Sequence, residues 1–256
     1  MSAFSVETEF LEVEHADQQL TIRLNRPDAL NALRPEMLEG IAALVEAAAN
    51  HAEVSVIILE GAGRAFSAGV DLKVLQGTEP CAGKIGDVFD APARRVGRAL
   101  REAAVPVIAK VHGACFTGAL EIALHCDFIL TTVDAKFGDT HTKFGLRPTW
   151  GMGQTLAQAI GVRRAKELSF TARTVRGDEA VVLGIANAAA ADGAALDALV
   201  AERATAIVRN SRPAVAAMKK LYGLAQEGHS IDAALSAEFD LEFEEIDDTK
   251  ERLAGF

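Results

Sequence analysis

Short apolar runs rich in β-branched residues alternate with helical segments over the first half of the chain. Strands that alternate with helices favour a mainly parallel sheet that is covered by helices. Residues 10–25 have the alternating pattern of a β-hairpin, with its turn at residues 15–17. The pattern therefore predicts an α/β fold. The expected strands are residues 55–61, 106–113 and 127–132, and the expected helices are residues 34–51, 90–104 and 119–126.

From about residue 150 onward the pattern becomes almost entirely helical. Apolar residues recur at helical spacing, and only residues 184–187 suggest one more strand. We therefore divide the chain into a βα-rich core, residues 1–190, and a helical C-terminal region, residues 191–256.

The composition argues against several classes of protein. A chain of 256 residues, half of them apolar, can bury a large core, and its net charge of −10 argues against nonspecific binding to nucleic acid or to an anionic membrane. Three cysteines without CxxC spacing and six histidines without an HExxH pattern indicate neither a disulfide scaffold nor a metal site. The N-terminus lacks the features of a secretory signal, and no apolar run approaches the roughly 20 residues that span a bilayer. The expected localisation is the cytoplasm.

Two strand-to-helix turns, residues 64–73 and 111–127, are rich in small residues. Small residues let a ligand approach the backbone, and a helix N-terminus leaves N–H groups unpaired. The amides of Ala68 and Gly118 are thus candidate donors to a single oxygen, which would form an oxyanion hole. The alternative is that these small residues only permit tight turns.

Glu121 lies in the middle of an otherwise apolar helical segment, one turn after Gly118 and on the same face. Burial of a carboxylate is costly unless it is paired or has a function. A role as general acid or base would explain it. The alternative is a surface glutamate that pairs with His125 four residues later.

Taken together, these residues resemble the crotonase superfamily, the enoyl-CoA hydratase/isomerase family. The resemblance runs along nearly the whole chain, in the family's order and spacing. The matching segments are LNRPDALNAL (24–33), GAGRAFSAGVDL (61–72), PVIAKVHGACFTGALEIALHCDF (106–128), FGDTHTKFGLRPTWGMG (137–153) and TARTVRGDEAVVLGIAN (171–187).

The resemblance implies a crotonase-like superhelix of stacked ββα units and an acyl-CoA thioester as substrate. The thioester carbonyl would be held by the amides that match Ala68 and Gly118, which stabilises an enolate. No cofactor is implied, because coenzyme A enters as part of the substrate. The family is usually assembled as a homotrimer or a dimer of trimers, with the C-terminal helices at subunit contacts. The apolar residues Leu235, Phe239 and Phe243 need either such a partner or the core to cover them.

The resemblance also implies residues around the nucleotide, the pantetheine and the acyl chain. Asp71 is equally well explained as a local helix cap. Trp150 could line the acyl tunnel, but a lone aromatic residue near a turn is more often part of the core. The implied set is Ala29, Leu30, Gly69, Val70, Asp71, Leu72 and Trp150.

His141 is the chain's main departure from the family, because the second glutamate of a typical hydratase falls on this position. Three interpretations follow. In the first, Glu121 activates water for addition to a trans-2-enoyl-CoA, while His141 positions the water or handles the α-carbon proton. In the second, the pair supports another enolate reaction, such as isomerisation, hydrolysis or decarboxylation. In the third, the protein binds acyl-CoA without catalysis. Histidine exchanges protons near neutral pH, which favours the first.

Overall fold

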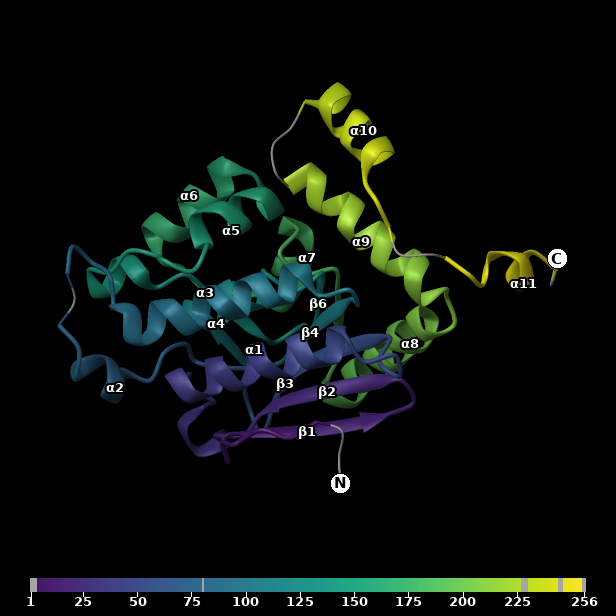
Figure 1. Ribbon diagram of the computed structural model, residues 1–256. Coiled ribbons are helices and arrows are strands. Elements are labelled where there is room, and N and C mark those ends of the chain that lie inside the picture. The colour runs from purple at the N-terminus through teal and green to yellow at the C-terminus, as the bar shows by residue number, and fades with distance from the viewer. Residues whose placement is uncertain (1–3, 80, 227–229, 244–245, 255–256) are drawn as a thin grey trace.

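The main sheet of the computed structural model, which describes residues 4–79, 81–226, 230–243 and 246–254, has six strands. Their order is β1-β2-β3-β4-β6-β9 (Figure 1), and every neighbouring pair after the β1–β2 hairpin is parallel. The predicted α/β class with a mainly parallel sheet is confirmed. The strands are β1 (Leu11–Ala16), β2 (Gln19–Leu24), β3 (Val56–Gly61), β4 (Val107–Val111), β6 (Phe128–Thr132) and β9 (Ala188–Ala190).

Two positions differ slightly from those expected. The hairpin turn is at Asp17 and Gln18, which both have positive φ, rather than at residues 15–17. The last strand, β9, follows the expected residues 184–187 directly instead of including them.

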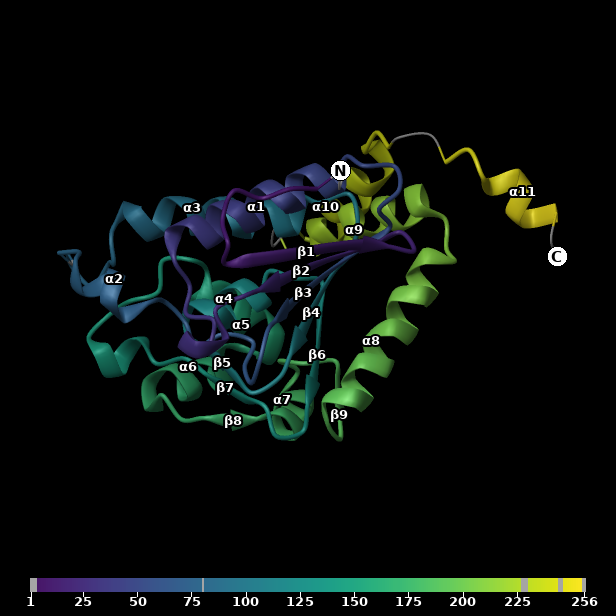
Figure 2. The ribbon, with the colours of Figure 1, turned by 90° about the horizontal axis from the view of Figure 1, so that it is seen from below.

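Helices cover both faces of this sheet (Figure 2). Helices α1 (Pro35–Ala49) and α3 (Asp87–Glu102) pack together on one face, and α8 (Gly193–Val208) lies on the other. Both faces are mostly apolar, as expected for parallel strands that are covered by helices on both sides. The contacts of α8 join Leu196, Val200 and Ala204 to Val56, Ile58, Ile108 and Leu130.

A second, three-stranded sheet was not expected from the sequence. It consists of β5 (Ala114–Phe116), β7 (Lys136–Gly138) and β8 (Val175–Arg176), in that order. Strand β5 leads directly into α4 (Gly118–Ala123), and β7 leads into the 3-10 turn η2 (His141–Phe144). Because β5 and β7 are paired, the small sheet places Glu121 and His141 near each other.

The remaining helices include two short ones early in the chain and several in its second half, where the apolar spacing predicted helices. A single turn, η1 (Pro27–Ala29), follows the hairpin, and α2 (Leu72–Gln76) follows the irregular segment 61–71. The others are α5 (Met152–Ile160), α6 (Val162–Thr171), α7 (Gly177–Leu183), α9 (Arg212–Gln226), α10 (Ile231–Asp240) and α11 (Thr249–Ala254).

After Ala190 the described part of the chain is helical, but packing on the sheet continues into α8. Helix α9 runs back beside α3, where Lys219 donates to the Leu100 carbonyl at 2.8 Å, and α10 then stands away from the body of the molecule (Figure 1). On α10, Leu235 is 59 % exposed and Phe239 is 91 % exposed. The core therefore does not cover this apolar face, and contact with a neighbouring subunit remains the other prediction.

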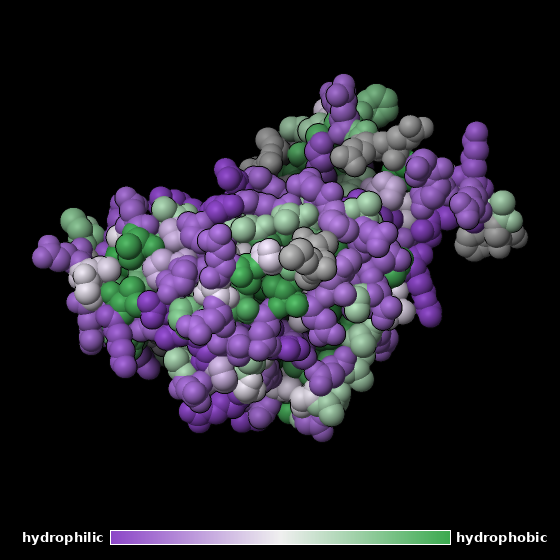
Figure 3. Space-filling view, turned by 60° about the horizontal axis from the view of Figure 1, so that its bottom comes forward, coloured by the Kyte–Doolittle hydropathy of each residue, from purple (hydrophilic) through white to green (hydrophobic). Residues whose placement is uncertain are grey.

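One face of the molecule is mostly polar. On the face shown in Figure 3, hydrophilic side chains predominate and apolar ones form small, separate groups. Across the described residues, no helix combines the length and the apolar character needed to cross a membrane.

Candidate active site

Glu121 is buried on α4 with 1 % of its surface exposed. Its Oε1 accepts hydrogen bonds from the backbone N–H groups of Trp150, at 3.2 Å, and Met152, at 3.0 Å. Burial raises the pKa of this carboxyl to about 7, although His141 and the two amides favour its ionised form. A carboxyl with this pKa can give or take a proton near neutral pH.

His141 begins the turn η2, and its ring lies between two carboxylates. Its Nε2 is 3.6 Å from Oε2 of Glu121, and its Nδ1 is 2.7 Å from Oδ1 of Asp139. All three side chains are buried. The structure therefore brings together the two predicted catalytic residues. Asp139, which no sequence pattern singled out, lies on the other side of the His141 ring from Glu121.

The 3.6 Å between Glu121 Oε2 and His141 Nε2 is longer than a direct hydrogen bond. Two atoms this far apart can both lie ~2.8 Å from a third, so one water molecule can hydrogen-bond to both at once. The pair is thus able to hold a nucleophilic water and to exchange protons with it.

The sequence-based assignment of the Ala68 amide to an oxyanion hole is wrong. The Ala68 N–H donates to the carbonyl of Leu30 at 2.9 Å, so it is not free to bind a ligand. By contrast, the Val70 N–H has no hydrogen-bond acceptor among the residues that the structure describes. The same holds, within the described chain, for the N–H of Gly118 at the first position of α4.

The unpaired amide of Val70 points away from the segment that pairs with its neighbours. Leu33 donates its N–H to the Gly69 carbonyl at 2.7 Å, and its own carbonyl accepts from the Asp71 N–H at 2.8 Å. Successive amides of an extended segment point to opposite sides. The Val70 N–H therefore faces away from Leu33.

The turns that carry Val70 and Gly118 lie side by side. Ser67 pairs with β5 in a short parallel bridge, and a Cβ on Gly69 would come within 2.9 Å of the Phe116 carbonyl oxygen. Two unpaired amides thus occupy adjacent turns, next to the helix that carries the buried carboxylate. This arrangement can hold one oxyanion from two sides.

Residues 24–33 dock against the first of these turns. The side chain of Asn31 is fully buried, and its Nδ2 donates to the carbonyls of Ala62 and Ala65, each at 2.8 Å. These hydrogen bonds, together with the bond from Ala68 to Leu30, hold residues 62–68 against residues 30–31.

Asp71 acts as the cap of α2. Its Oδ1 accepts the Lys73 N–H at 3.0 Å, and its Oδ2 lies 2.9 Å from Nη2 of Arg26. Of the other residues implied around coenzyme A, Ala29 and Leu72 are exposed, so a ligand can reach them, but their contact with one stays a prediction.

Trp150 lies directly on the second turn. Its ring is 5 % exposed and packs so close to Gly118 that a Cβ there would lie 2.5 Å from a ring carbon. The indole N–H donates to Oδ1 of Asp90 at 3.0 Å, and Thr149 donates to the same atom at 2.6 Å. The ring is thus held beside the Gly118 amide, where it can limit the space for an acyl group.

His125 supports the segment that holds Glu121, a role that no sequence pattern indicates. The His125 Nε2 lies 2.7 Å from the Trp150 carbonyl, and its Nδ1 lies 2.9 Å from Nη1 of Arg101. A surface pair between Glu121 and His125, the alternative left open by the sequence, is wrong because both are buried and His125 binds these other partners. Burial lowers the pKa of His125, which keeps the ring neutral.

The hydroxyl groups of Thr117 and Thr140 link the turn before α4 to the turn before η2. Thr117, just before α4, has φ 52° and ψ −113°, a conformation that β-branched residues rarely adopt. Its hydroxyl shares a short hydrogen bond with that of Thr140 and accepts the Thr140 N–H at 3.3 Å. The turns that carry Gly118 and His141 are therefore tied together.

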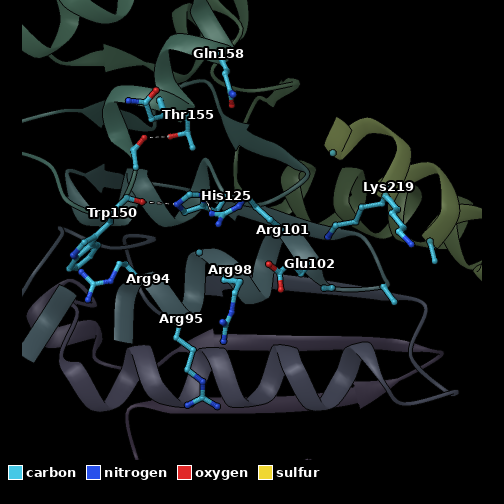
Figure 4. A pocket seen from close by; sticks show the side chains of 18 of the residues that line it. Arg94, Arg95, Arg98, Arg101, Glu102, His125, Trp150, Thr155, Gln158 and Lys219 are labelled. Carbon is cyan, nitrogen blue, oxygen red and sulfur yellow. Dashed lines mark hydrogen bonds between the residues drawn. The ribbon is translucent and has the colours of Figure 1, made fainter. Parts of the chain in front are cut away.

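A basic groove lies between α3, α5 and α9 (Figure 4). It has a volume of about 1320 Å³, and Arg94, Arg98 and Arg101 line it at helical spacing from α3. His125 lies at this groove, with its hydrogen bond to the Trp150 carbonyl drawn in Figure 4. Trp150 lines this groove, and its backbone N–H donates to Glu121. The described residues contain no cluster of three or more side chains suited to hold a metal ion.

Comparison with known families identifies the chain. The model of the family described as enoyl-CoA hydratase/isomerase matches residues 15–256. The chain belongs to the enoyl-CoA hydratase/isomerase family. The membership implied by the sequence motifs is thus confirmed.

Individual relatives agree with this membership. A short-chain-enoyl-CoA hydratase of Clostridium acetobutylicum is 31 % identical over 247 residues, which cover 95 % of this chain and 93 % of the relative. A probable peroxisomal enoyl-CoA hydratase of Arabidopsis thaliana is 34 % identical over 78 % of this chain and 73 % of its own.

The solved structures show that the fold is also that of the family. An enoyl-CoA hydratase of Bacillus anthracis has a TM-score of 0.87 at 29 % identity, over 96 % of this chain and 94 % of its own. An enoyl-CoA hydratase subunit of Geobacillus kaustophilus has a TM-score of 0.85 at 29 % identity, over 100 % and 96 %. The predicted crotonase-like fold is confirmed.

Proposed function

We propose that this protein adds water to a trans-2-enoyl-CoA and releases a 3-hydroxyacyl-CoA. The support comes from the family membership, from relatives named as enoyl-CoA hydratases, and from one feature of the site. That feature is the buried pair of Glu121 Oε2 and His141 Nε2, 3.6 Å apart, which can bind one water molecule between two groups that exchange protons.

The amides of Val70 and Gly118 hold the thioester oxygen. As electrons move from the C2–C3 double bond onto this oxygen, the two N–H groups stabilise the resulting enolate. The loss of one such donor typically costs about 10²–10³ in rate. Trp150, packed on Gly118, sets one wall of the acyl site.

Glu121 and His141 divide the two proton transfers. Ionised Glu121 takes a proton from water through Oε2 as the water oxygen bonds to C3. Protonated His141 then gives the proton on Nε2 to C2, which converts the enolate to the thioester. The proton now on Glu121 returns to His141 across the 3.6 Å gap, so the pair is ready for another cycle. One water is consumed and both residues are regenerated.

The test is to mix the purified protein with a short and a long trans-2-enoyl-CoA and to follow the loss of the conjugated enoyl absorbance. The products are then separated and identified. We expect 3-hydroxyacyl-CoA, with faster turnover of the short substrate because Trp150 occupies space beside Gly118.

Other products contradict the proposal. A shifted double bond without a hydroxyl group would indicate isomerisation, and free acid with coenzyme A would indicate hydrolysis. Binding of acyl-CoA with no turnover of either substrate would indicate a non-catalytic binder. As a control, Glu14→Gln removes an exposed carboxylate on β1, the edge strand of the main sheet, and should leave the rate unchanged.

A further inference from the structure

We propose that Asp139 is a positioning residue that fixes the orientation and the tautomer of His141. Its effect on rate rests on the proposed hydration, whereas its effect on the ring can be measured without any substrate. Neither the sequence motifs nor the comparisons assign a role to Asp139.

One oxygen of Asp139 binds His141 at two points. Oδ1 accepts from ring Nδ1 at 2.7 Å and from the backbone N–H of His141 at 3.2 Å. A single acceptor that holds both the backbone and the ring of the same residue restricts rotation of the side chain. With Nδ1 fixed on Asp139, only Nε2 can face Glu121.

Asp139 can serve as this anchor because it stays ionised. Burial raises the pKa of its carboxyl, but hydrogen bonds from His141 and from the Ser169 hydroxyl outweigh burial and lower the pKa below its ordinary value. An ionised carboxylate only accepts hydrogen bonds, so the proton of the shared bond belongs to Nδ1. The lone pair of the neutral ring is then on Nε2, beside Glu121 and the substrate.

The opposite arrangement at His125 shows that the environment selects the tautomer in this protein. Arg101 can only donate, so Nδ1 of His125 must accept, and its Nε2 carries the proton that binds the Trp150 carbonyl. A single sample therefore contains an internal reference of the other tautomer.

The experiment compares Asp139→Ala and Asp139→Asn with the unmodified protein. Nitrogen-15 NMR of the imidazoles, assigned with His141→Gln and His125→Gln, reports the tautomers, and kcat and KM are measured with a short trans-2-enoyl-CoA. Asp134→Asn is the matched control, because it removes the same charge at an exposed position five residues earlier.

We expect the neutral His141 ring to carry its proton on Nδ1 in the unmodified protein and in the control. In Asp139→Ala the Nε2–H tautomer appears, and kcat falls about hundredfold with little change in KM. In Asp139→Asn the amide oxygen still accepts both bonds, so the tautomer is kept, but the weaker bond lowers kcat about tenfold. The His125 signals stay unchanged throughout.

The proposal is overturned if Asp139→Ala keeps both the Nδ1–H tautomer and kcat. If Asp139→Ala does not fold, Asp139→Asn decides instead. Its weaker bond should shift the Nδ1–H signal and lower kcat, and the proposal is overturned if neither changes. If the unmodified protein hydrates no enoyl-CoA but Asp139→Ala still changes the tautomer, the proposed function fails while the positioning of His141 by Asp139 is supported.

Discussion

At the scale of single residues, Glu121 becomes suited to proton transfer because of its burial. An exposed glutamate is almost fully ionised at neutral pH and is a weak base. Here, burial raises the pKa to about 7, while two backbone amides and His141 keep the ionised form accessible. The same environment would be costly for a carboxylate with no function.

The pH dependence of kcat/KM follows from this pKa. Hydration needs ionised Glu121, and protonation below about pH 7 removes the base, so we expect kcat/KM to rise with pH through an acid limb near 7. The measurement is kcat/KM for a short trans-2-enoyl-CoA across pH. An acid limb near the ordinary glutamate value of 4.5 would contradict the role of Glu121 as base.

His141 is tested by two substitutions. His141→Ala removes the group that gives the α-carbon proton, so we expect kcat to fall about 10²–10⁴-fold. His141→Glu restores a group that can carry a proton, and it should recover part of the lost rate. Steady-state kinetics check both variants. An unchanged kcat in His141→Ala would show that the histidine only supports the turn.

At the scale of elements, the long strands and helices follow from the sequence, but the small sheet does not. Strands such as β3 and β4 are mostly apolar, with one charged residue each, and helices such as α1 have a clear apolar period. The strands β5, β7 and β8 have only two or three residues each, too few for a period, and depend on pairing with distant segments.

The same limit explains which site residues could be predicted. Glu121 and His141 follow from the family spacing, but the spacing cannot tell which amide of residues 67–71 is free. That depends on the bond from Ala68 to Leu30, a contact across 38 positions. Asp139 has only a weak local signal: an aspartate often accepts the backbone N–H two residues later, as it does here from His141.

The hydrogen bond from His125 to the Trp150 carbonyl gives a prediction about the segment that holds Glu121. His125 holds the Trp150 carbonyl, between the two peptide groups whose amides bind Glu121. In His125→Ala this segment loses its support, so we expect weaker amide bonds, a higher pKa for Glu121 and an acid limb of kcat/KM that moves to higher pH.

The control for this prediction is Arg98→Ala. Arg98 lines the groove from α3, the helix that also carries Arg101, but within the described chain it has no hydrogen bond to His125. Its pH profile should match that of the unmodified protein. An acid limb that stays in place in His125→Ala would show that His125 does not support the Glu121 site.

At the scale of the whole molecule, α10 presents apolar side chains that this chain does not cover. Phe239 is 91 % exposed and Leu235 is 59 % exposed. Large apolar side chains that cluster on an exposed helix indicate a contact surface. This agrees with the trimer, or dimer of trimers, that the family resemblance implies, and it remains a proposal for this protein.

We expect Phe239→Ser to weaken subunit contact and to lower the mass measured by light scattering at low protein concentration. Phe170→Ser is the matched control, because Phe170 is 72 % exposed on α6, away from the C-terminal helices. A monomeric unmodified protein, or an equal loss of mass in both variants, would contradict the assignment of α10 to a subunit contact.

The central claim, that Glu121 drives the addition of water to a bound enoyl thioester, is tested most directly with oxygen-18 water. A short trans-2-enoyl-CoA is incubated in labelled water with the unmodified protein or with Glu121→Gln, and the product is analysed by mass spectrometry. We predict one labelled oxygen at C3 with the unmodified protein and about 10²–10⁴-fold slower labelling with Glu121→Gln, which still binds the thioester. Unlabelled product, or equal labelling rates, would contradict the claim.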